Sequence, residues 1–182
     1  YQAIVTMDQA GLVTDWNRFA ESTFGWTAAE ARGHRLSDLI IPADLRQAHD
    51  EGLTRFLATG RGAVIDQRIE ISAQRRNGEV FPVELAISAA RAGEGWQFTA
   101  LMHDISARKA QMEEFETAFH HASVGMALVT LDGGFNKVNA AFCDIVGYDE
   151  TQMLATDFQT ITYPADLDKD MALLGQLIDG RI

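Results

Sequence analysis

The chain has 182 residues and a formal net charge of −11 at pH 7, from 15 Lys and Arg against 26 Asp and Glu. This charge opposes binding to nucleic acid, which basic side chains hold by releasing counterions from the polyanion. Apolar runs such as Leu39-Ile40-Ile41-Pro42 are far shorter than the roughly 20 residues that span a bilayer, so we expect a soluble, cytoplasmic chain whose residues make no membrane contact.

The chain opens with a pattern that recurs further along. Ile4-Val-Thr-Met-Asp8 returns as Leu128-Val-Thr-Leu-Asp132, and in both places glycine and a second apolar stretch follow, which predicts a strand, a tight turn and a strand. From Asn17 onward the two copies keep a constant spacing of 122 residues. The matching segments are Asn17 with Asn139, Phe24-Gly25-Trp26 with Val146-Gly147-Tyr148, and Pro42–Leu45 with Pro164–Leu167. The chain therefore contains an internal repeat of one folding unit.

In the first copy a helix and three strands follow. Apolar or small side chains recur at helical spacing and Gly60 ends the run, which predicts an amphipathic helix over Asp44–Thr59. Three β-rich stretches come next, and an Asn77-Gly78 turn joins the first two. These stretches are Ala63–Gln74, Val80–Ala89 and Trp96–Ile105. Together the elements predict an α+β fold, in which an antiparallel five-stranded sheet carries helices on one face.

A predicted linker helix joins the two copies. We expect a first domain over residues 1–106, the helix over residues 107–122 and the N-terminal part of a second domain over residues 123–182. One face of the helix is apolar, which fits a coiled-coil contact between two copies of the chain or packing on its own sheet. This face carries Met112, Phe115, Phe119 and Ala122. The second copy lacks the last three strands, so we expect it to be less ordered or to be completed by a partner.

Several motifs resemble those of PAS domains. They are Phe24-Gly-Trp-Thr27 with Glu30 and Gly33, Arg75-Arg-Asn-Gly78 with Phe81-Pro82, and Asp104-Ile-Ser-Ala-Arg-Lys109. The resemblance covers residues 1–109 fully and 117–182 in part, and implies two PAS sensory domains in tandem, the second truncated. It also implies a homodimer formed through the linker helix and the PAS surfaces, with a covalently linked output domain such as a histidine kinase, or a cyclase or phosphodiesterase of cyclic diguanylate. No catalytic constellation lies in these residues, so we expect no enzyme activity from them.

His49 lies in a segment, Asp44–Phe56, that resembles the one in which haem-containing PAS oxygen sensors place their proximal iron ligand. The resemblance implies haem b in the first domain, with His49 as the axial metal ligand. Leu53, Phe56, Val64, Leu85 and Ile87 would supply an apolar wall, and the resemblance implies that Val64, Leu85 and Ile87 lie on the distal side of the haem; Gln67 and Ile69 complete the candidate site. Met171 stands at the position of His49 in the second copy, so only the first domain is a haem candidate. We therefore expect the first domain to sense a diatomic gas or a redox state.

The sequence departs from those oxygen sensors on the distal side of the haem. Their distal arginine falls on Ile69, and Arg68 is one residue away, which places it on the opposite face of a strand. Gln67 shares the parity of Ile69 and could reach a distal ligand. Oxygen, nitric oxide, carbon monoxide and redox sensing therefore all stay open. Two other interpretations stay open as well: a cofactor-free module for dimerisation and signal relay, and a PAS domain that binds another small molecule.

Overall fold

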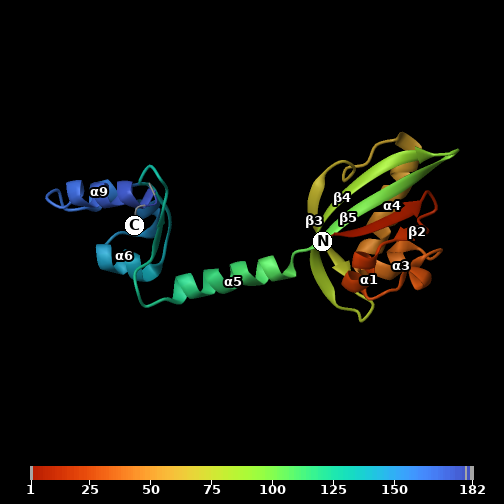
Figure 1. The fold of residues 1–182 in the computed structure, drawn as a ribbon, viewed down its shortest axis with the longest axis horizontal. Coiled ribbons are helices and arrows are strands. Elements are labelled where there is room, and N and C mark those ends of the chain that lie inside the picture. Colours follow the sequence, from red (N-terminus) through yellow and green to blue (C-terminus); the bar gives the residue numbers. More distant parts are fainter. Residues whose placement is uncertain (1, 179, 181–182) are drawn as a thin grey trace. The chain divides into compact units, whose positions relative to one another are not determined.

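The computed structural model describes residues 2–178 and 180, which fold as two units, one up to Ala110 and the other from Gln111 onward (Figure 1). Helix α5 (Ser106–His121) begins in the first unit and continues into the second, so the expected helix between the two copies is present. Each unit has its own sheet and its own cluster of buried apolar side chains. Among the described residues, no helix is both long enough and apolar enough to cross a membrane.

The first unit is built on a five-stranded antiparallel sheet, as the sequence predicts. Its strands lie in the order β2-β1-β5-β4-β3, so the first and last strands of the unit pair with each other. They are β1 (Ala3–Asp8), β2 (Val13–Trp16), β3 (Arg68–Gln74), β4 (Val80–Ala92) and β5 (Gly95–Asp104). β4 and β5 form a long hairpin, in which Val83 pairs with Asp104. The last strand therefore ends beside β4, directly before α5.

Helices cover one face of this sheet (Figure 1). They are α1 (Arg18–Phe24), α2 (Ala28–Ala31), α3 (Leu36–Ile40), the 3-10 helix η1 (Ala43–Leu45) and α4 (Arg46–Thr59). α4 begins two residues later than the sequence predicts, because η1 precedes it. The rings of Trp16 and Phe81 lie 5.5 and 5.8 Å from the ring of Phe24, which is completely buried. The core of the first unit thus lies between the helices and the sheet, which confirms the α+β class.

The segment before β3 differs from the sequence-based expectation. The pattern predicts a strand from Ala63, whereas β3 begins at Arg68. Ile65 forms an isolated parallel bridge with Ile87, and the amide of Asp66 donates to the Ile87 carbonyl at 2.8 Å. This segment therefore meets β4 in the parallel direction and does not extend the antiparallel ladder. Asp66 has a φ of 57°, and this left-handed residue turns the backbone into β3.

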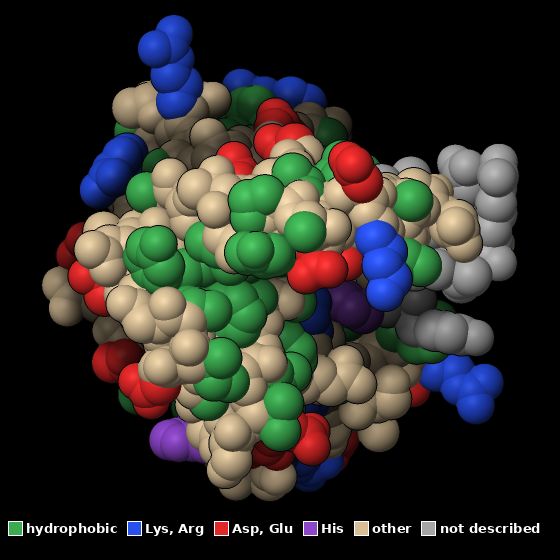
Figure 2. Space-filling model, turned by 90° about the vertical axis from the view of Figure 1, so that its left-hand side faces the viewer, with side chains coloured by type: hydrophobic (Ala, Val, Ile, Leu, Met, Phe, Trp, Pro, Cys, Tyr) green, Lys and Arg blue, Asp and Glu red, His purple; other side chains and the backbone are tan. Residues whose placement is uncertain are grey.

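The second unit repeats the start of the first. It contains β6 (Ala127–Val129), β7 (Phe135–Val138), α6 (Ala140–Val146), α7 (Glu150–Leu154), α8 (Phe158–Ile161) and α9 (Leu167–Ile178). Its described strands form a two-stranded sheet, as expected for a copy without its last three strands. Figure 2 looks onto this unit and shows apolar side chains gathered at its surface. Leu128 and Val129 of β6 are 41% and 45% exposed, whereas β1, the equivalent strand, is almost entirely buried between β2 and β5.

Equivalent residues of the two units make equivalent hydrogen bonds, each within its own unit. Asn17 caps α1 and also accepts from the amide of Ile4. Asn139 caps α6 and also accepts from the amide of Met126. Ile4 and Met126 are 122 residues apart, so the constant spacing holds for the opening strands as well, and the match of Ile4 with Leu128 is wrong by two residues. The hydrogen bond to the asparagine shows which residues of the two opening strands are equivalent. The similarity of their apolar residues alone does not decide this.

Candidate ligand-binding site

One face of α4 points toward the sheet and carries His49, Leu53 and Phe56, here called the inner stripe. These residues are four and three positions apart, so their side chains lie on one side of the helix. Phe56 is 4% exposed, Leu53 packs against the core, and the His49 side chain is 23% exposed. The structure thus brings three of the predicted site residues together at the inner face of α4.

β3 and β4 add an apolar wall to the same core. Ile69 pairs with Leu85 across the two strands, and Ile87 lies two residues further along the same face of β4. Leu85 is buried, and Ile69 and Ile87 are partly buried against the core. These three predicted site residues therefore belong to the core that the inner stripe faces.

Two aromatic residues of β5 complete this core, and sequence reasoning did not include them in the site. The ring of Phe56 packs edge-on against Trp96 and Phe98, with centroid distances of 4.9 and 5.0 Å. Ile65 also packs on the core, and Gly62 leaves room for it, since a Cβ at Gly62 would lie 2.8 Å from Ile65 Cγ1. The alternation of Trp96 and Phe98 along the predicted last strand is the pattern that could have placed both rings on the inner face.

Val64 and Gln67 stand apart from this group. Both lie in the loop between α4 and β3, where Val64 is 38% exposed and Gln67 is also exposed. The parity argument for Gln67 assumed a strand through Gln67 and Ile69, but β3 begins only at Arg68. Arg68 does lie on the outer face, where it pairs with Glu84 at 3.3 Å. The loop therefore holds Val64 and Gln67 at the surface.

The imidazole of His49 has the chemistry of an axial ligand. Its Nδ1 lies 3.1 Å from Asp50 Oδ1, and Asp50 Oδ2 accepts a hydrogen bond from Arg35 at 3.1 Å. With the proton on Nδ1, the ring donates to Asp50 and leaves the lone pair of Nε2 for iron. A carboxylate behind a ligating histidine orients the ring and raises its basicity. The donor and the apolar wall are the residue types that a haem site requires, but the Phe56 ring fills the core between α4 and β5 in this structure.

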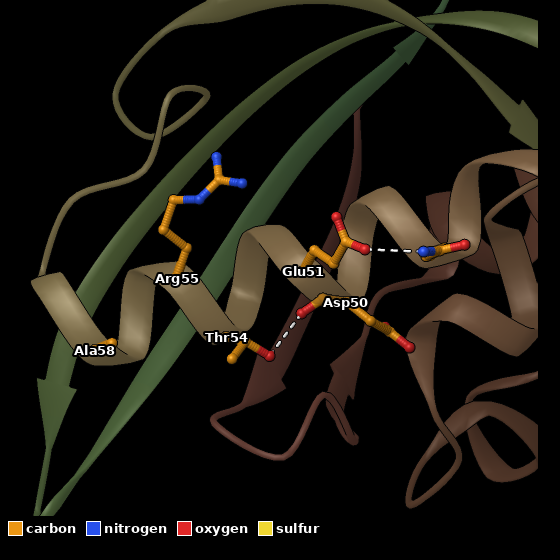
Figure 3. Close-up of a pocket in the computed structure, with 6 residues that line it drawn as sticks. Asp50, Glu51, Thr54, Arg55 and Ala58 are labelled. Carbon is orange, nitrogen blue, oxygen red and sulfur yellow. Dashed lines mark hydrogen bonds between the residues drawn. The ribbon is translucent and has the colours of Figure 1, made fainter.

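A hollow of about 760 Å³ lies on another side of α4 (Figure 3). It is lined by Gln47, Asp50, Glu51, Thr54, Arg55 and Ala58. Two of its polar side chains bond within the helix: Thr54 Oγ1 donates to the Asp50 carbonyl, and Gln47 donates to Glu51, each at 2.9 Å. Neither His49 nor Phe56 lines it. The hollow is a groove of the helix surface and is separate from the inner stripe.

Arg75 and Asp104 join the sheet to α5. Arg75 Nη2 donates to Asp104 Oδ2 at 2.7 Å, and Asp104 Oδ1 accepts from the amide of Ser106 at 2.9 Å. The Arg75 guanidinium also lies 3.7 Å from the Phe81 ring centroid and donates to the Thr23 carbonyl. Burial raises the pKa of Asp104, but hydrogen bonding by Ser106 and Arg75 outweighs burial and holds the pKa below its ordinary value. The start of α5 is thus anchored by a charged carboxylate.

Asp104→Asn is expected to weaken the acid dependence of the first unit's stability. Because the folded pKa is depressed, the carboxylate stabilises the fold above its unfolded pKa of about 4, and this contribution is lost as the pH falls through the folded pKa. The partly exposed ion pair contributes about 1 kcal/mol at neutral pH after screening by water. Urea unfolding at about pH 7 and about pH 3 measures the difference in the free energy of unfolding between the parent chain and the variant. A difference that is equal at both pH values would contradict this role of Asp104.

Comparisons with known proteins agree with this architecture. Residues 2–105 match the PAS fold, and residues 113–177 match the PAS domain. The sensor protein FixL of Bradyrhizobium diazoefficiens is 27% identical over 124 residues, which are 66% of this chain and 24% of FixL. The oxygen sensor protein DosP of Escherichia coli is 26% identical over 147 residues, 79% of this chain and 18% of DosP. The probable diguanylate cyclase DgcE of Escherichia coli is 35% identical over 88 residues, 46% of this chain and 8% of DgcE.

The chain spans less than a quarter of the length of each of these relatives. The similarity therefore concerns one region of each relative and does not extend to the rest of that protein. The first match alone covers more than half of this chain, and both matches are to sensory domains and not to a catalytic domain. The chain belongs to the PAS family and contains two PAS sensory domains in tandem, the second matched over residues 113–177.

Proposed function

We propose that the first PAS domain binds haem b through His49 and senses a diatomic gas or a redox state. The observation that carries this proposal is the position of His49 on the inner stripe, one helical turn before Leu53, which packs against the apolar core, together with its hydrogen bond to Asp50. The same segment resembles the proximal segment of haem-containing PAS oxygen sensors. The similarity to DosP, which is an oxygen sensor protein, supports the same class of signal.

Each residue of the site has a defined task in this proposal. His49 would hold the iron, and a bound haem would supply an iron centre that takes a gas molecule or changes its oxidation state. Leu53, Ile69, Leu85 and Ile87 would keep water from the porphyrin, because their side chains are apolar and face the core. The Phe56 ring, which packs on Trp96 and Phe98, would have to move aside to admit the porphyrin.

The nature of the ligand depends on the loop between α4 and β3. Ile69 has no hydrogen-bond donor for bound oxygen, and Val64 and Gln67 lie at the surface, so they would form a distal shell only if the loop folded inward. Nitric oxide, carbon monoxide and redox sensing therefore remain candidates beside oxygen.

The whole protein is proposed to pass this signal to an output domain in the same polypeptide. The similarities to a sensor protein and to a probable diguanylate cyclase favour a histidine kinase, or a cyclase or phosphodiesterase of cyclic diguanylate, in the cytoplasm. α5 supports a homodimer, because Met112 and Phe115 are 61% and 43% exposed on one face of the helix. A coiled-coil contact between two copies would cover these side chains.

An absorption spectrum of the haem-supplemented chain tests the proposal. We expect a Soret band that is retained in His34→Ala and lost in His49→Ala, because only His49 lies on the inner stripe. His34 is the matched control, since it is an exposed histidine of the same domain. A chain without a Soret band, or a band that survives in His49→Ala, would rule out haem ligation by His49.

A second candidate function follows from the packed core. The Phe56 ring already fills the space beside Trp96 and Phe98, as it would in a cofactor-free domain that relays signals between its neighbours. A domain that binds another small apolar molecule would use the same core. A chain that dimerises through α5 and shows no Soret band would favour the cofactor-free relay.

A further inference from the structure

The first turn of α5 carries two cations and no acidic side chain of its own. Arg108 and Lys109 follow Ser106 and Ala107, at the end of the helix where unpaired amide groups concentrate a partial positive charge. Cations are unfavourable there, because they face charge of the same sign. The helix start is therefore favoured when another element supplies a negative charge.

Asp104 places one negative charge at the Ser106 amide, and Glu70 of β3 supplies a second, beside the two cations. Its Oε1 accepts from Arg108 Nη2 at 2.6 Å, and its Oε2 lies 2.8 Å from Lys109 Nζ. Hydrogen bonding by Lys109 lowers the pKa of Glu70, although burial opposes this shift. The lowered pKa means that the charged form of Glu70 is favoured. All three side chains are about half exposed, so dissolved salt screens the contact. One carboxylate on an edge strand thus holds two successive residues of α5.

The residues beside Glu70 connect this contact to the core. Successive side chains of a strand point to opposite faces, so Ile69 and Ile71 pack on the core while Glu70 lies on the outer face. β3 is the last strand in the sheet order and is bonded to β4 alone among the described strands. A shift of β3 that starts at Ile69 would therefore move Glu70 with it.

Two further residues fix where α5 begins. Ile105 is 2% exposed, and its amide donates to the Pro82 carbonyl at 3.2 Å. Asp104 accepts from the amide of Ser106. These contacts hold the position of the helix start, whereas the contact with Glu70 acts later in the first turn, at Arg108 and Lys109, and restrains the direction of the helix.

We propose that Glu70 is a positioning residue that sets the direction of α5 relative to the sheet of the first PAS domain, and that β3 passes changes in the core to this helix. The first half of the proposal, the positioning role of Glu70, applies to the chain with or without a bound ligand. The second half rests on the proposed sensing function, because it needs a ligand that alters the core.

Glu70→Gln in the 182-residue chain without added cofactor tests the first half. Hydrogen exchange of the α5 amides beyond the first turn is expected to become roughly three- to fivefold faster. An increase of this size corresponds to the small stabilisation that exposed ion pairs provide. The amides of β3 and β4 are expected to keep their rates, which a general loss of stability would not allow. Added salt at about 1 M should bring the parent chain close to the variant.

Glu84→Gln is the matched control. Glu84 pairs with Glu70 in register and lies on the same face of the sheet, but it binds Arg68 instead of α5. Its loss is expected to leave the α5 amides unchanged. Unchanged α5 rates in Glu70→Gln, or an equal increase in both variants, would overturn the proposal.

A second measurement separates this proposal from that of haem binding. With haem bound, addition of carbon monoxide is expected to change α5 exchange in the parent chain and not in Glu70→Gln, while both keep the Soret band. A change that persists in Glu70→Gln would overturn the role of β3. A missing Soret band counts against haem binding alone, because the comparison of the Glu70 and Glu84 variants is made without haem.

Discussion

Replacing Asn139 with alanine is expected to unfold the second unit while the first unit stays folded. Asn139 is 1% exposed, and its side chain makes four hydrogen bonds. It donates to the carbonyls of Phe119 and Val124 and accepts from the amides of Met126 and Phe142. Alanine leaves these groups without their partner and removes the N-cap of α6, for a combined loss of about 4 kcal/mol. A small unit with a two-stranded sheet has little more stability than this.

Asn17→Ala is the matched control, because Asn17 holds the equivalent position in the first unit. Its side chain accepts from the amides of Ile4 and Ala20, donates to the Gln2 carbonyl, and is more exposed than that of Asn139. We expect a loss of about 2 kcal/mol, confined to the first unit. Hydrogen exchange read separately for the two units measures both variants. Full protection of α6 and β7 in Asn139→Ala would contradict the structural role assigned to Asn139.

The elements of the first unit could be predicted because they depend on residues close together in the sequence. Alternation along β4 and the helical period of α4 are local patterns, and the second pattern also places His49, Leu53 and Phe56 on one face. The internal repeat extends this success to the second unit, since Asn17 and Asn139 cap equivalent helices. The sequence therefore predicts the architecture and the inner stripe.

Contacts between distant segments could not be predicted in the same way. Glu70 and Arg108 are 38 residues apart, and only the sheet order brings β3 beside the start of α5. The packing of Phe56 against β5 likewise depends on the tertiary arrangement. The apolar residues of the loop before β3 predict a strand, but Asp66 adopts a left-handed conformation that aspartate tolerates better than most residues. Because the backbone turns at Asp66, Val64 and Gln67 lie at the surface and do not contribute to the predicted apolar wall.

Phe56→Ala is expected to lower the free energy of unfolding of the first unit by about 3–5 kcal/mol. The substitution removes both edge-on ring contacts, with Trp96 and Phe98, and leaves a cavity between α4 and β5. It does not weaken the helix itself, because alanine has the highest helix propensity. Urea unfolding followed by tryptophan fluorescence measures the loss, since Trp96 lies against the substituted ring.

Leu57→Ala separates the loss of this core contact from the loss of any large side chain on α4. Leu57 is the next residue along the helix and is 39% exposed, so we expect a loss of less than about 1 kcal/mol. Equal losses in the two variants would contradict the assignment of Phe56 to the core. The pair of variants also bears on ligand entry, because a molecule that enters this core has to displace the Phe56 ring. Benzene is therefore expected to restore part of the stability of Phe56→Ala by filling the cavity, and to leave Leu57→Ala unchanged.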